Sequence, residues 1–349
     1  MTDQALTDAV RGHLRAHLAS HPAAGAEDIV KYIFQALLGV GHLLGSPEQV
    51  ESYLTGEMSA LQPDPEEPLT KPVGPDWCRL NLRRAMAEGL ATRDIARLML
   101  SAPSSAHTRQ EVANVCLAIA EAEKLPDLRG VLACLEDPVW LPSHSEAYRA
   151  AYRPAYRVIG ADWMPLTEAV CRIARLKREK KRVTVTLDGP CASGKTTIAQ
   201  KLAEICDAAV LHTDDFVIPH AQKTPERLAV PGGNCDCERI AAEVLAPWAA
   251  GEAPVFRRYD CHADCLLPPE TLPDRPVLLL EGSYCNLPAL RAYADLRLFA
   301  DTPEDVRTER LLRRESPASM EMFRTRWIPL ENAYFTAFGL PDADCIRVR

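Results

Sequence analysis

The chain has 349 residues, of which 47% are hydrophobic and 25% charged, with a formal net charge of −8 at pH 7. The composition is typical of a globular protein, and the length fits two domains. The negative net charge disfavours binding to nucleic acid or anionic membrane through bulk charge. No apolar run approaches the roughly 20 residues that span a bilayer, and the first residues lack the basic-then-apolar order of a signal peptide. We therefore expect a cytoplasmic protein that contacts no membrane. Homo-oligomerisation stays open.

The first half, residues 1–165, has the apolar spacing of helices and is predicted to form an all-α domain. Helical patterns recur at residues 29–38, 79–87, 92–100 and 108–123. The first of these suits a buried helix that Gly39 and Gly41 end. Proline-rich stretches at residues 62–68 and 71–75 are expected to be exposed connections.

Residues 143–157 carry two stripes of side chains. Tyrosines and arginines each recur every four residues, at Tyr148, Tyr152 and Tyr156 and at Arg149, Arg153 and Arg157. On a helix this spacing makes an aromatic stripe beside a cationic one, which could hold a nucleotide or another anion, although Pro154 interrupts such a helix. We favour the alternative, in which the tyrosines pack the domain and the arginines pair with surface acids.

A basic run at residues 175–182 separates the two halves. It is most simply the solvated end of a linking helix, predicted over residues 166–182, where positive charge suits the C-terminal end of the helix dipole.

Residues 183–197 read as a short strand, a glycine-bounded loop and the start of a helix. From Gly189 they match G-x-x-x-x-G-K-[ST]. The two glycines let backbone N–H groups turn around a phosphate chain, and the helix points its positive end at the same anion. Lys195 is placed to reach the β- and γ-phosphates, and Thr196 to bind Mg²⁺. We predict an ATP site, with Mg²⁺, formed by Gly189, Pro190, Cys191, Ala192, Ser193, Gly194, Lys195, Thr196 and Thr197.

From residue 183 onward strand and helix patterns alternate, which predicts an α/β domain over residues 183–349, with a parallel sheet covered by helices. The expected strands cover residues 183–188, 208–212, 277–281, 296–300 and 345–348. Ligands of such sheets bind beyond the carboxyl ends of the strands. Four acids follow or end strands: Asp214, Asp215, Glu281 and Asp301.

Phosphoryl transfer needs one carboxylate to accept a proton and another to hold Mg²⁺. Asp214 and Glu281 are the candidates for these two tasks, whereas Asp301 is interpreted as a helix cap.

The chain has twelve cysteines, scattered over both halves, and we expect them to be reduced in a protein of this kind. One group comes closer to metal-ligand spacing: Cys235, Cys237, Cys261, His262 and Cys265. Zinc would need four of these five groups to converge. Neither C-x-C nor C-x-x-x-C is the common C-x-x-C knuckle, so unrelated thiols are the favoured interpretation.

The ordered motifs of the second half resemble the uridine kinase and phosphoribulokinase-like family of P-loop kinases, especially bacterial uridine kinase-like proteins. The resemblance rests on residues 189–197, 212–216, 231–236, 258–260, 280–284 and 299–314. The N-terminal half is similar to a segment of unknown role that accompanies some of these kinases. The resemblance implies an ATP-dependent kinase domain with an extra N-terminal domain.

The resemblance also implies roles for single residues. Asp214 falls at the family's catalytic aspartate, Asp236 at the aspartate that contacts ribose hydroxyls, and Tyr259 where an aromatic ring packs near the base. Arg310 and Arg314 fall in a mobile lid, predicted around residues 307–325, whose arginines neutralise the transferring phosphoryl group together with Lys195.

Two departures from the family bear on the acceptor. Members specific for pyrimidine nucleosides carry an aromatic residue and a histidine after the Tyr-Asp pair, where this chain has Cys261 and Asp264, so uridine itself stays open. Later in the chain, Glu331 and Tyr334 either line the acceptor pocket or pack the core, and packing is favoured.

These patterns predict a phosphotransferase that acts on an alcohol group of a small molecule, first of all a nucleoside such as uridine or cytidine. Another small alcohol, a sugar or a sugar phosphate is the alternative acceptor, and Arg227 and Arg239 near the acceptor loop would favour an anionic one, with Arg239 as a substrate-binding candidate. An ATP-driven switch with a partner- or RNA-binding N-terminal domain is the alternative from another class. The chain lacks the N-K-x-D and L-S-G-G-Q signatures, which leaves the switch little support.

Overall fold

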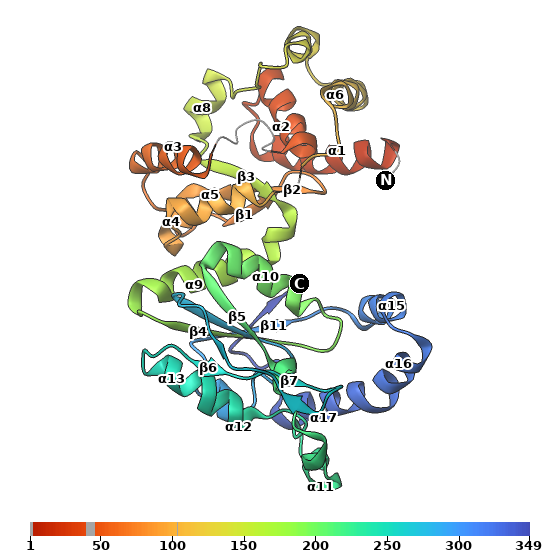
Figure 1. Ribbon diagram of the computed structural model, residues 1–349. Helices are drawn as coiled ribbons and strands as arrows, with labels where there is room; N and C mark the ends of the chain where they lie inside the picture. The colour runs from red at the N-terminus through yellow and green to blue at the C-terminus, as the bar shows by residue number, and fades with distance from the viewer. Residues whose placement is uncertain (1–2, 40–45, 103) are drawn as a thin grey trace. The chain divides into compact units, whose positions relative to one another are not determined.

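The computed structural model describes residues 3–39, 46–102 and 104–349, and the chain divides into two compact units, Met1–Thr167 and Glu168–Arg349 (Figure 1). The N-terminal unit consists of α1 (Asp3–Ser20), α2 (Ala26–Leu38), α3 (Pro47–Ser59), β1 (Thr70–Pro72), β2 (Trp77–Asn81), α4 (Leu82–Glu88), α5 (Thr92–Leu100), α6 (Arg109–Glu123), α7 (Arg129–Leu132), η1 (Ala133–Glu136), α8 (Glu146–Tyr152), β3 (Tyr156–Gly160) and η2 (Ala161–Leu166). Here η denotes a short 3-10 or π-helical segment.

Helix α2 lies at the centre of the N-terminal core. Its apolar face is buried with residues of α1 and α6, among them Val10, Ile33 and Ile119, each less than 1% exposed. Gly39 ends α2 with a φ of 60°, as predicted, whereas Gly41 lies outside the described residues. The predicted helices over residues 92–100 and 108–123 are confirmed as α5 and α6.

A three-stranded antiparallel sheet, in the order β1-β2-β3, corrects the all-α prediction for this unit. Residues 79–81, predicted to be helical, belong to β2, because Trp77, Cys78 and Leu80 are buried and β2 pairs with a strand on each side. The helix starts only at Leu82, where the Asn81 side chain accepts a hydrogen bond from the backbone N–H of Arg84 at 3.1 Å.

The C-terminal unit consists of α9 (Thr167–Glu179), β4 (Val183–Asp188), α10 (Lys195–Cys206), β5 (Ala208–His212), η3 (Thr213–Phe216), η4 (His220–Gln222), α11 (Pro225–Ala229), α12 (Cys237–Arg239), η5 (Ile240–Leu245), α13 (Ala246–Ala249), β6 (Val255–Phe256), β7 (Tyr259–Asp260), β8 (Cys265–Leu266), β9 (Glu270–Thr271), β10 (Val277–Glu281), α14 (Pro288–Arg291), β11 (Leu296–Ala300), α15 (Glu304–Arg314), α16 (Pro317–Met322), η6 (Phe323–Trp327), α17 (Ile328–Phe338) and β12 (Cys345–Val348).

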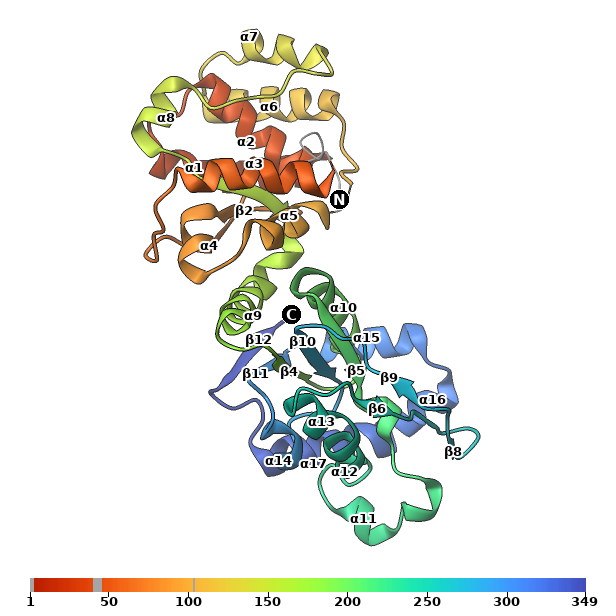
Figure 2. The same ribbon diagram turned by 60° about the vertical axis from the view of Figure 1, so that its left-hand side comes forward.

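Five of these strands form one parallel sheet in the order β12-β11-β4-β10-β5, which confirms the predicted α/β fold and its strands. Helices α9 and α10 cover one face, and α12, α13, α14 and α17 cover the other (Figures 1 and 2). Because β4 and β5 both pair with β10, the carboxyl ends of these three strands meet at one edge. None of the helices in the described part of the chain has the length and apolar character needed to cross a membrane.

Candidate active site

The loop between β4 and α10, residues 189–194, has a backbone that only glycine allows at two positions. Gly189 has a φ of 145°, and a Cβ there would lie 2.8 Å from the carbonyl oxygen of Ala300. Gly194 has a φ of 93° and precedes α10 without a side-chain cap, so the first N–H groups of the helix face the loop. Ser193, 2% exposed, carries a buried Oγ with no hydrogen-bond partner among the described residues. These donors fit the phosphate chain of a nucleotide.

Two cationic side chains predicted to act on the phosphates lie against this loop. The ammonium group of Lys195 donates to the carbonyl oxygens of Gly189 at 2.8 Å and Pro190 at 3.0 Å. Arg310, on α15, donates to the carbonyl oxygen of Ala192 at 3.0 Å. Arg314 does not reach the loop and pairs with Glu315 at 2.7 Å instead.

Arg307 also reaches the loop, and the sequence analysis did not assign it a role. Its guanidinium donates to the carbonyl oxygen of Cys191 at 3.4 Å. Arg307 and Arg310 are three residues apart on α15, so they share one face of the helix. That spacing was the available signal. Arg314 has the same helical spacing, four residues beyond Arg310, so only its pairing with Glu315 separates it from the other two arginines.

Glu281 joins the loop helix to the neighbouring strand. It ends β10, is 4% exposed, and accepts a hydrogen bond from the hydroxyl of Thr196 at 3.1 Å. The ring nitrogen Nδ1 of His212 lies 2.5 Å from the same carboxylate oxygen, and this hydrogen bond raises the pKa of His212. A hydroxyl and a carboxylate oxygen at this spacing are the donor types that Mg²⁺ takes in kinases, so the pair fits the metal. His212 was not predicted; its register opposite Glu281 is a property of the sheet.

Asp214 and Asp215 follow β5 in η3. Asp214 is open to solvent on one side, yet the surrounding protein atoms desolvate its carboxylate and raise its pKa; Lys195 opposes this shift and Glu281 adds to it. Desolvation also raises the pKa of Asp215. A carboxyl group with a raised pKa is a better proton acceptor than a free aspartate, which suits general-base chemistry.

The segment around Asp236 lies against the segment that carries Asp214. The backbone N–H of Asp236 donates to the carbonyl oxygen of Phe216 at 2.7 Å, and Val217 and Cys235 form an isolated antiparallel bridge. Asp236 is 8% exposed and caps α12 by accepting from the backbone N–H of Arg239 at 3.2 Å. The structure thus brings two of the acceptor-site candidates, Asp214 and Asp236, to neighbouring loops.

The other acceptor-site candidates are held by partners within the protein. Arg239 pairs with Glu243 at 2.7 Å, and its guanidinium lies 5.1 Å from the ring centre of Phe216. Arg227 pairs with Glu238 at 2.9 Å. The buried Tyr259 donates its hydroxyl hydrogen bond to Asp264, and Asp264 also accepts from the backbone N–H of His220 at 3.0 Å.

Glu331 and Tyr334 of α17 contact the loop and the strand before it. Glu331 accepts hydrogen bonds from the backbone N–H of Cys191 at 2.9 Å and from the hydroxyl of Ser283 at 2.6 Å. Tyr334, which is less than 1% exposed, donates to Asp188 at 2.7 Å. Asp188 was also missed by the sequence analysis, although it is the last residue of the predicted strand. Its buried carboxylate anchors the loop by accepting from the N–H of Gly189 at 2.8 Å.

Two further predictions concern side chains away from this loop. Asp301 pairs with Arg347 at 2.8 Å, and Pro303 precedes α15, so the interpretation of Asp301 as a helix cap is wrong. Cys235 is buried, whereas Cys261 and Cys265 are exposed. Within the described residues, no group of three or more His, Cys, Asp or Glu side chains is placed to hold a metal ion.

Several known proteins are similar to part of this chain, although no family model matches it. A uridine kinase of Ligilactobacillus salivarius is 28% identical over 149 residues, which cover 40% of this chain and 68% of that protein. The structure of a proposed uridine kinase of Bacillus stearothermophilus is 19% identical, with a TM-score of 0.40, and covers 52% of this chain and 100% of its own. The structure of a proposed fructose transport system kinase of a Silicibacter species is 21% identical, with a TM-score of 0.43, and the match covers 52% of this chain and 98% of that protein.

Proposed function

Because the C-terminal half of the chain is distantly related to the uridine kinase-like family of P-loop kinases, we propose that it transfers the γ-phosphoryl group of ATP to a hydroxyl group of a neutral small molecule, with a nucleoside as the first candidate. The N-terminal part is additional to that family. One observation carries the proposal: the phosphate-binding loop, Thr196 with Glu281, and Asp214 all lie where the carboxyl ends of β4, β10 and β5 meet.

In the proposed reaction, residues 189–197 surround the triphosphate and the backbone N–H groups at the start of α10 donate to it, while Thr196 and Glu281 would hold Mg²⁺. The metal, when bound, neutralises phosphate charge. Lys195 moves from its carbonyl partners in the loop to the phosphates, since a phosphate oxygen is a stronger acceptor for an ammonium group. Asp214 accepts the proton of the acceptor hydroxyl as that oxygen attacks the phosphorus in line.

Arg310 and Arg307 complete the phosphate site in this proposal. Both already contact loop carbonyls, so they need only short side-chain movements to reach a transferring phosphoryl group. We assign residues 307–325, which include most of α15 and all of α16, to a lid that closes over the nucleotide. Closure would also exclude water, which otherwise competes with the acceptor for the phosphoryl group.

A neutral acceptor is favoured over a sugar phosphate. Arg227 and Arg239, the cations that would bind an acceptor phosphate, are paired with Glu238 and Glu243. An anionic acceptor would have to break one of these ion pairs. Asp236 instead offers a carboxylate oxygen for sugar hydroxyls beside the segment that carries Asp214, which suits a nucleoside or another polyol. ATP is a cytoplasmic substrate, so we expect the enzyme to act there.

The test is ATP consumption with Mg²⁺ across a panel of nucleosides, sugars, sugar phosphates and pantothenate, with products identified by mass spectrometry and Lys195→Ala as the blank. Phosphorylated uridine or cytidine would support the nucleoside assignment despite Cys261 and Asp264. A phosphorylated sugar would keep the reaction and change the acceptor. Loss of ATP without any phosphorylated acceptor would contradict the kinase and favour an ATP-driven switch.

A further inference from the structure

A buried arginine without an acidic partner stands at the centre of the N-terminal unit. Arg79, on the middle strand β2, is 6% exposed. Its Nε and Nη2 atoms donate to the side-chain oxygen of Gln35 at 3.2 and 2.9 Å. Its guanidinium carbon lies 4.2 Å from the ring centre of Tyr156 and 4.9 Å from that of Tyr32. No carboxylate in the described part of the chain forms an ion pair with it, and a buried charge without a counter-charge is costly.

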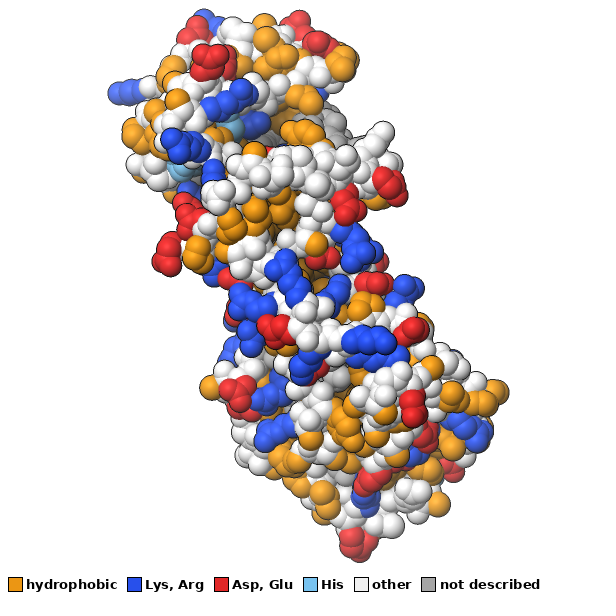
Figure 3. Space-filling view, turned by 90° about the vertical axis from the view of Figure 1, so that its left-hand side faces the viewer, with side chains coloured by type: hydrophobic (Ala, Val, Ile, Leu, Met, Phe, Trp, Pro, Cys, Tyr) orange, Lys and Arg blue, Asp and Glu red, His pale blue; other side chains and the backbone are white. Residues whose placement is uncertain are grey.

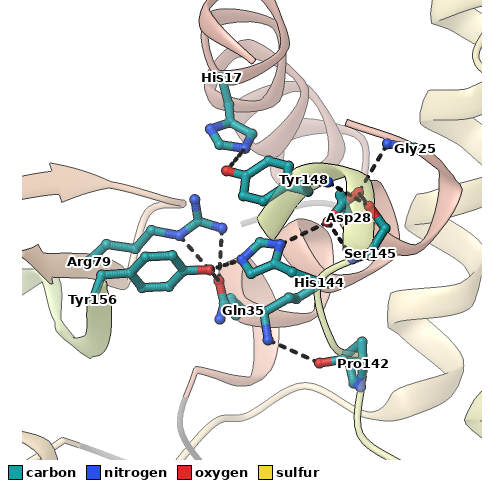
Figure 4. Close-up of polar contacts among 11 residues, drawn as sticks. His17, Gly25, Asp28, Gln35, Arg79, Pro142, His144, Ser145, Tyr148 and Tyr156 are labelled. Carbon is teal, nitrogen blue, oxygen red and sulfur yellow. Dashed lines mark hydrogen bonds and ion pairs between the residues drawn. The ribbon is translucent and has the colours of Figure 1, made fainter. Parts of the chain in front are cut away.

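A chain of hydrogen bonds fixes the surroundings of Arg79 (Figure 4). Burial lowers the pKa of His144 to about 4, so its ring is neutral near pH 7. Its Nδ1 donates to the carboxylate of Asp28 at 2.8 Å, which leaves Nε2 to accept from the hydroxyl of Tyr156 at 2.6 Å. Asp28 is itself 1% exposed and accepts from the hydroxyl and the N–H of Ser145. These hydrogen bonds therefore hold the ring of Tyr156 in place against the guanidinium of Arg79.

Arg79 lines a cavity of about 290 Å³. The lining contains four cationic residues, Lys71, Arg79, Arg83 and Arg153, and one acidic residue, Glu67. On the face drawn in Figure 3, lysine and arginine side chains (blue) lie beside histidines (pale blue) in the upper, N-terminal unit. This excess of positive charge over negative charge makes the cavity, which we call the Arg79 cavity, suited to an anion.

A buried histidine also belongs to the lining of this cavity. His17 lines it, is 2% exposed, and has an Nδ1 atom with no hydrogen-bond partner among the described residues. The other ring nitrogen lies 3.2 Å from the hydroxyl of Tyr148. If that nitrogen accepts from Tyr148, Nδ1 carries a proton and is a buried donor without an acceptor. Such groups are rare in proteins, and because surrounding atoms screen this one from solvent, a molecule in the cavity would contact it only after the neighbouring rings move.

We propose that the Arg79 cavity binds a small phosphorylated molecule. A phosphate monoester carries a charge of about −1.5 to −2 at pH 7 and three acceptor oxygens, so it matches several cations better than a single carboxylate does. Guanidinium groups also bind phosphate through paired N–H donors. The half-buried rings of His21 and Tyr152 line the same cavity and provide planar surfaces for the rest of the molecule. The cavity volume suits a small molecule rather than a strand of RNA.

The cavity lies within the N-terminal unit, so this site does not depend on the kinase reaction. The test is isothermal titration calorimetry of the full chain carrying Lys195→Ala, which weakens phosphate binding at residues 189–197. The probes are inorganic phosphate, uridine 5′-monophosphate, citrate and a short oligouridylate. We expect a saturable isotherm with the two phosphate compounds. The double substitution Lys71→Ala and Arg83→Ala, at the half-buried or exposed rim, should raise their Kd about tenfold or more.

The matched control is Arg129→Ala, which removes an arginine that is 84% exposed elsewhere on this unit and should change Kd by less than about twofold. Arg79→Gln should abolish binding; should this variant unfold, as circular dichroism would show, the rim substitutions still decide. The absence of any isotherm in the Lys195→Ala chain, or an isotherm that the rim substitutions leave unchanged, would overturn the proposal. Citrate binding as tightly as the phosphates would overturn the phosphate assignment. Binding of oligouridylate alone would replace it with RNA.

Discussion

The loop at residues 189–197 and the Arg79 cavity both gather positive charge, but they do so by different means. The loop has two glycines, the backbone N–H groups at the start of α10 and one lysine. The cavity uses side chains from β1, β2, α4 and the end of α8, held by hydrogen bonds between residues more than a hundred positions apart, such as Asp28 and His144. A predicted anion site made of backbone can therefore be recognised from a sequence motif, whereas the proposed site made of side chains can be recognised only in the folded unit.

The largest effect is expected when the lysine of the loop is removed. Lys195→Ala should lower phosphoryl transfer about 10³- to 10⁵-fold, because the charge that develops on the phosphates loses its nearest cation. Initial rates of product formation at saturating ATP measure this. Lys181→Ala, an exposed lysine of the same unit, is the matched control and should keep the wild-type rate. A comparable rate for both variants would contradict the role of the loop.

The next largest effect is expected at Asp214. Asp214→Asn should lower kcat about 10²- to 10⁴-fold, with little change in the KM for ATP, because it removes a proton acceptor and leaves the loop intact. Asp215→Asn, the adjacent carboxylate, is the matched control and should retain most of kcat. An Asp214→Asn enzyme with the wild-type kcat would refute the base assignment.

The pH dependence of the same residue sharpens this test. Desolvation raises the pKa of Asp214 above its usual value of 3.8. A base must be ionised, so kcat should fall as the pH drops through that raised pKa, and the Asn variant should lose this acid limb. The free energy of unfolding depends on pH in the opposite direction to kcat, because the folded chain holds the proton on Asp214 more tightly than the unfolded chain does. The contribution of protonated Asp214 to the free energy of unfolding is complete below pH 3.8, and it is lost as the pH rises through the raised pKa of Asp214 in the folded chain.

A smaller loss of kcat is expected at the two arginines of the predicted lid, and it should differ between them. Arg310→Ala should lower kcat about 10²-fold, because its guanidinium already contacts the loop at Ala192. Arg314→Ala, which removes an exposed side chain paired with Glu315, should lower kcat by less than about threefold. Steady-state kinetics of the two variants test this. Equal losses would mean that closure of the lid brings Arg314 to the phosphates as well.

The smallest effect concerns the hydrogen bonds of Asp28 with His144 and Ser145, beside the Arg79 cavity. Asp28→Asn should lower the free energy of unfolding by about 1–3 kcal/mol, because a buried carboxylate that accepts from His144 and Ser145 is replaced by a weaker acceptor. Urea unfolding of the full chain measures it. Asp127→Asn, whose side chain is 73% exposed, is the control and should be neutral. Equal free energies of unfolding for the two variants would mean that the hydrogen bonds of Asp28 do not stabilise the N-terminal unit.

Local patterns in the sequence were sufficient for most of the C-terminal fold. The strands over residues 208–212, 277–281, 296–300 and 345–348 have the predicted bounds, because apolar runs flanked by polar residues mark buried parallel strands. The loop from Gly189 to Thr196 is contiguous, so its form follows from residue spacing. Asp214 and Glu281 could be proposed because they follow or end strands, where ligands of such sheets bind.

Tertiary structure decided what depends on neighbours far along the chain. Residues 79–81 became a strand because β2 acquires partners on both sides, and Tyr156 left the helical stripe of Tyr148 and Tyr152 to join that sheet as part of β3. His212 meets Glu281 only through strand register, and Arg239 meets Glu243 rather than an open pocket. Burial, register and ion pairing are properties of assembled surfaces. For that reason the buried cation at Arg79, which forms no ion pair with the described carboxylates, became evident only in the fold.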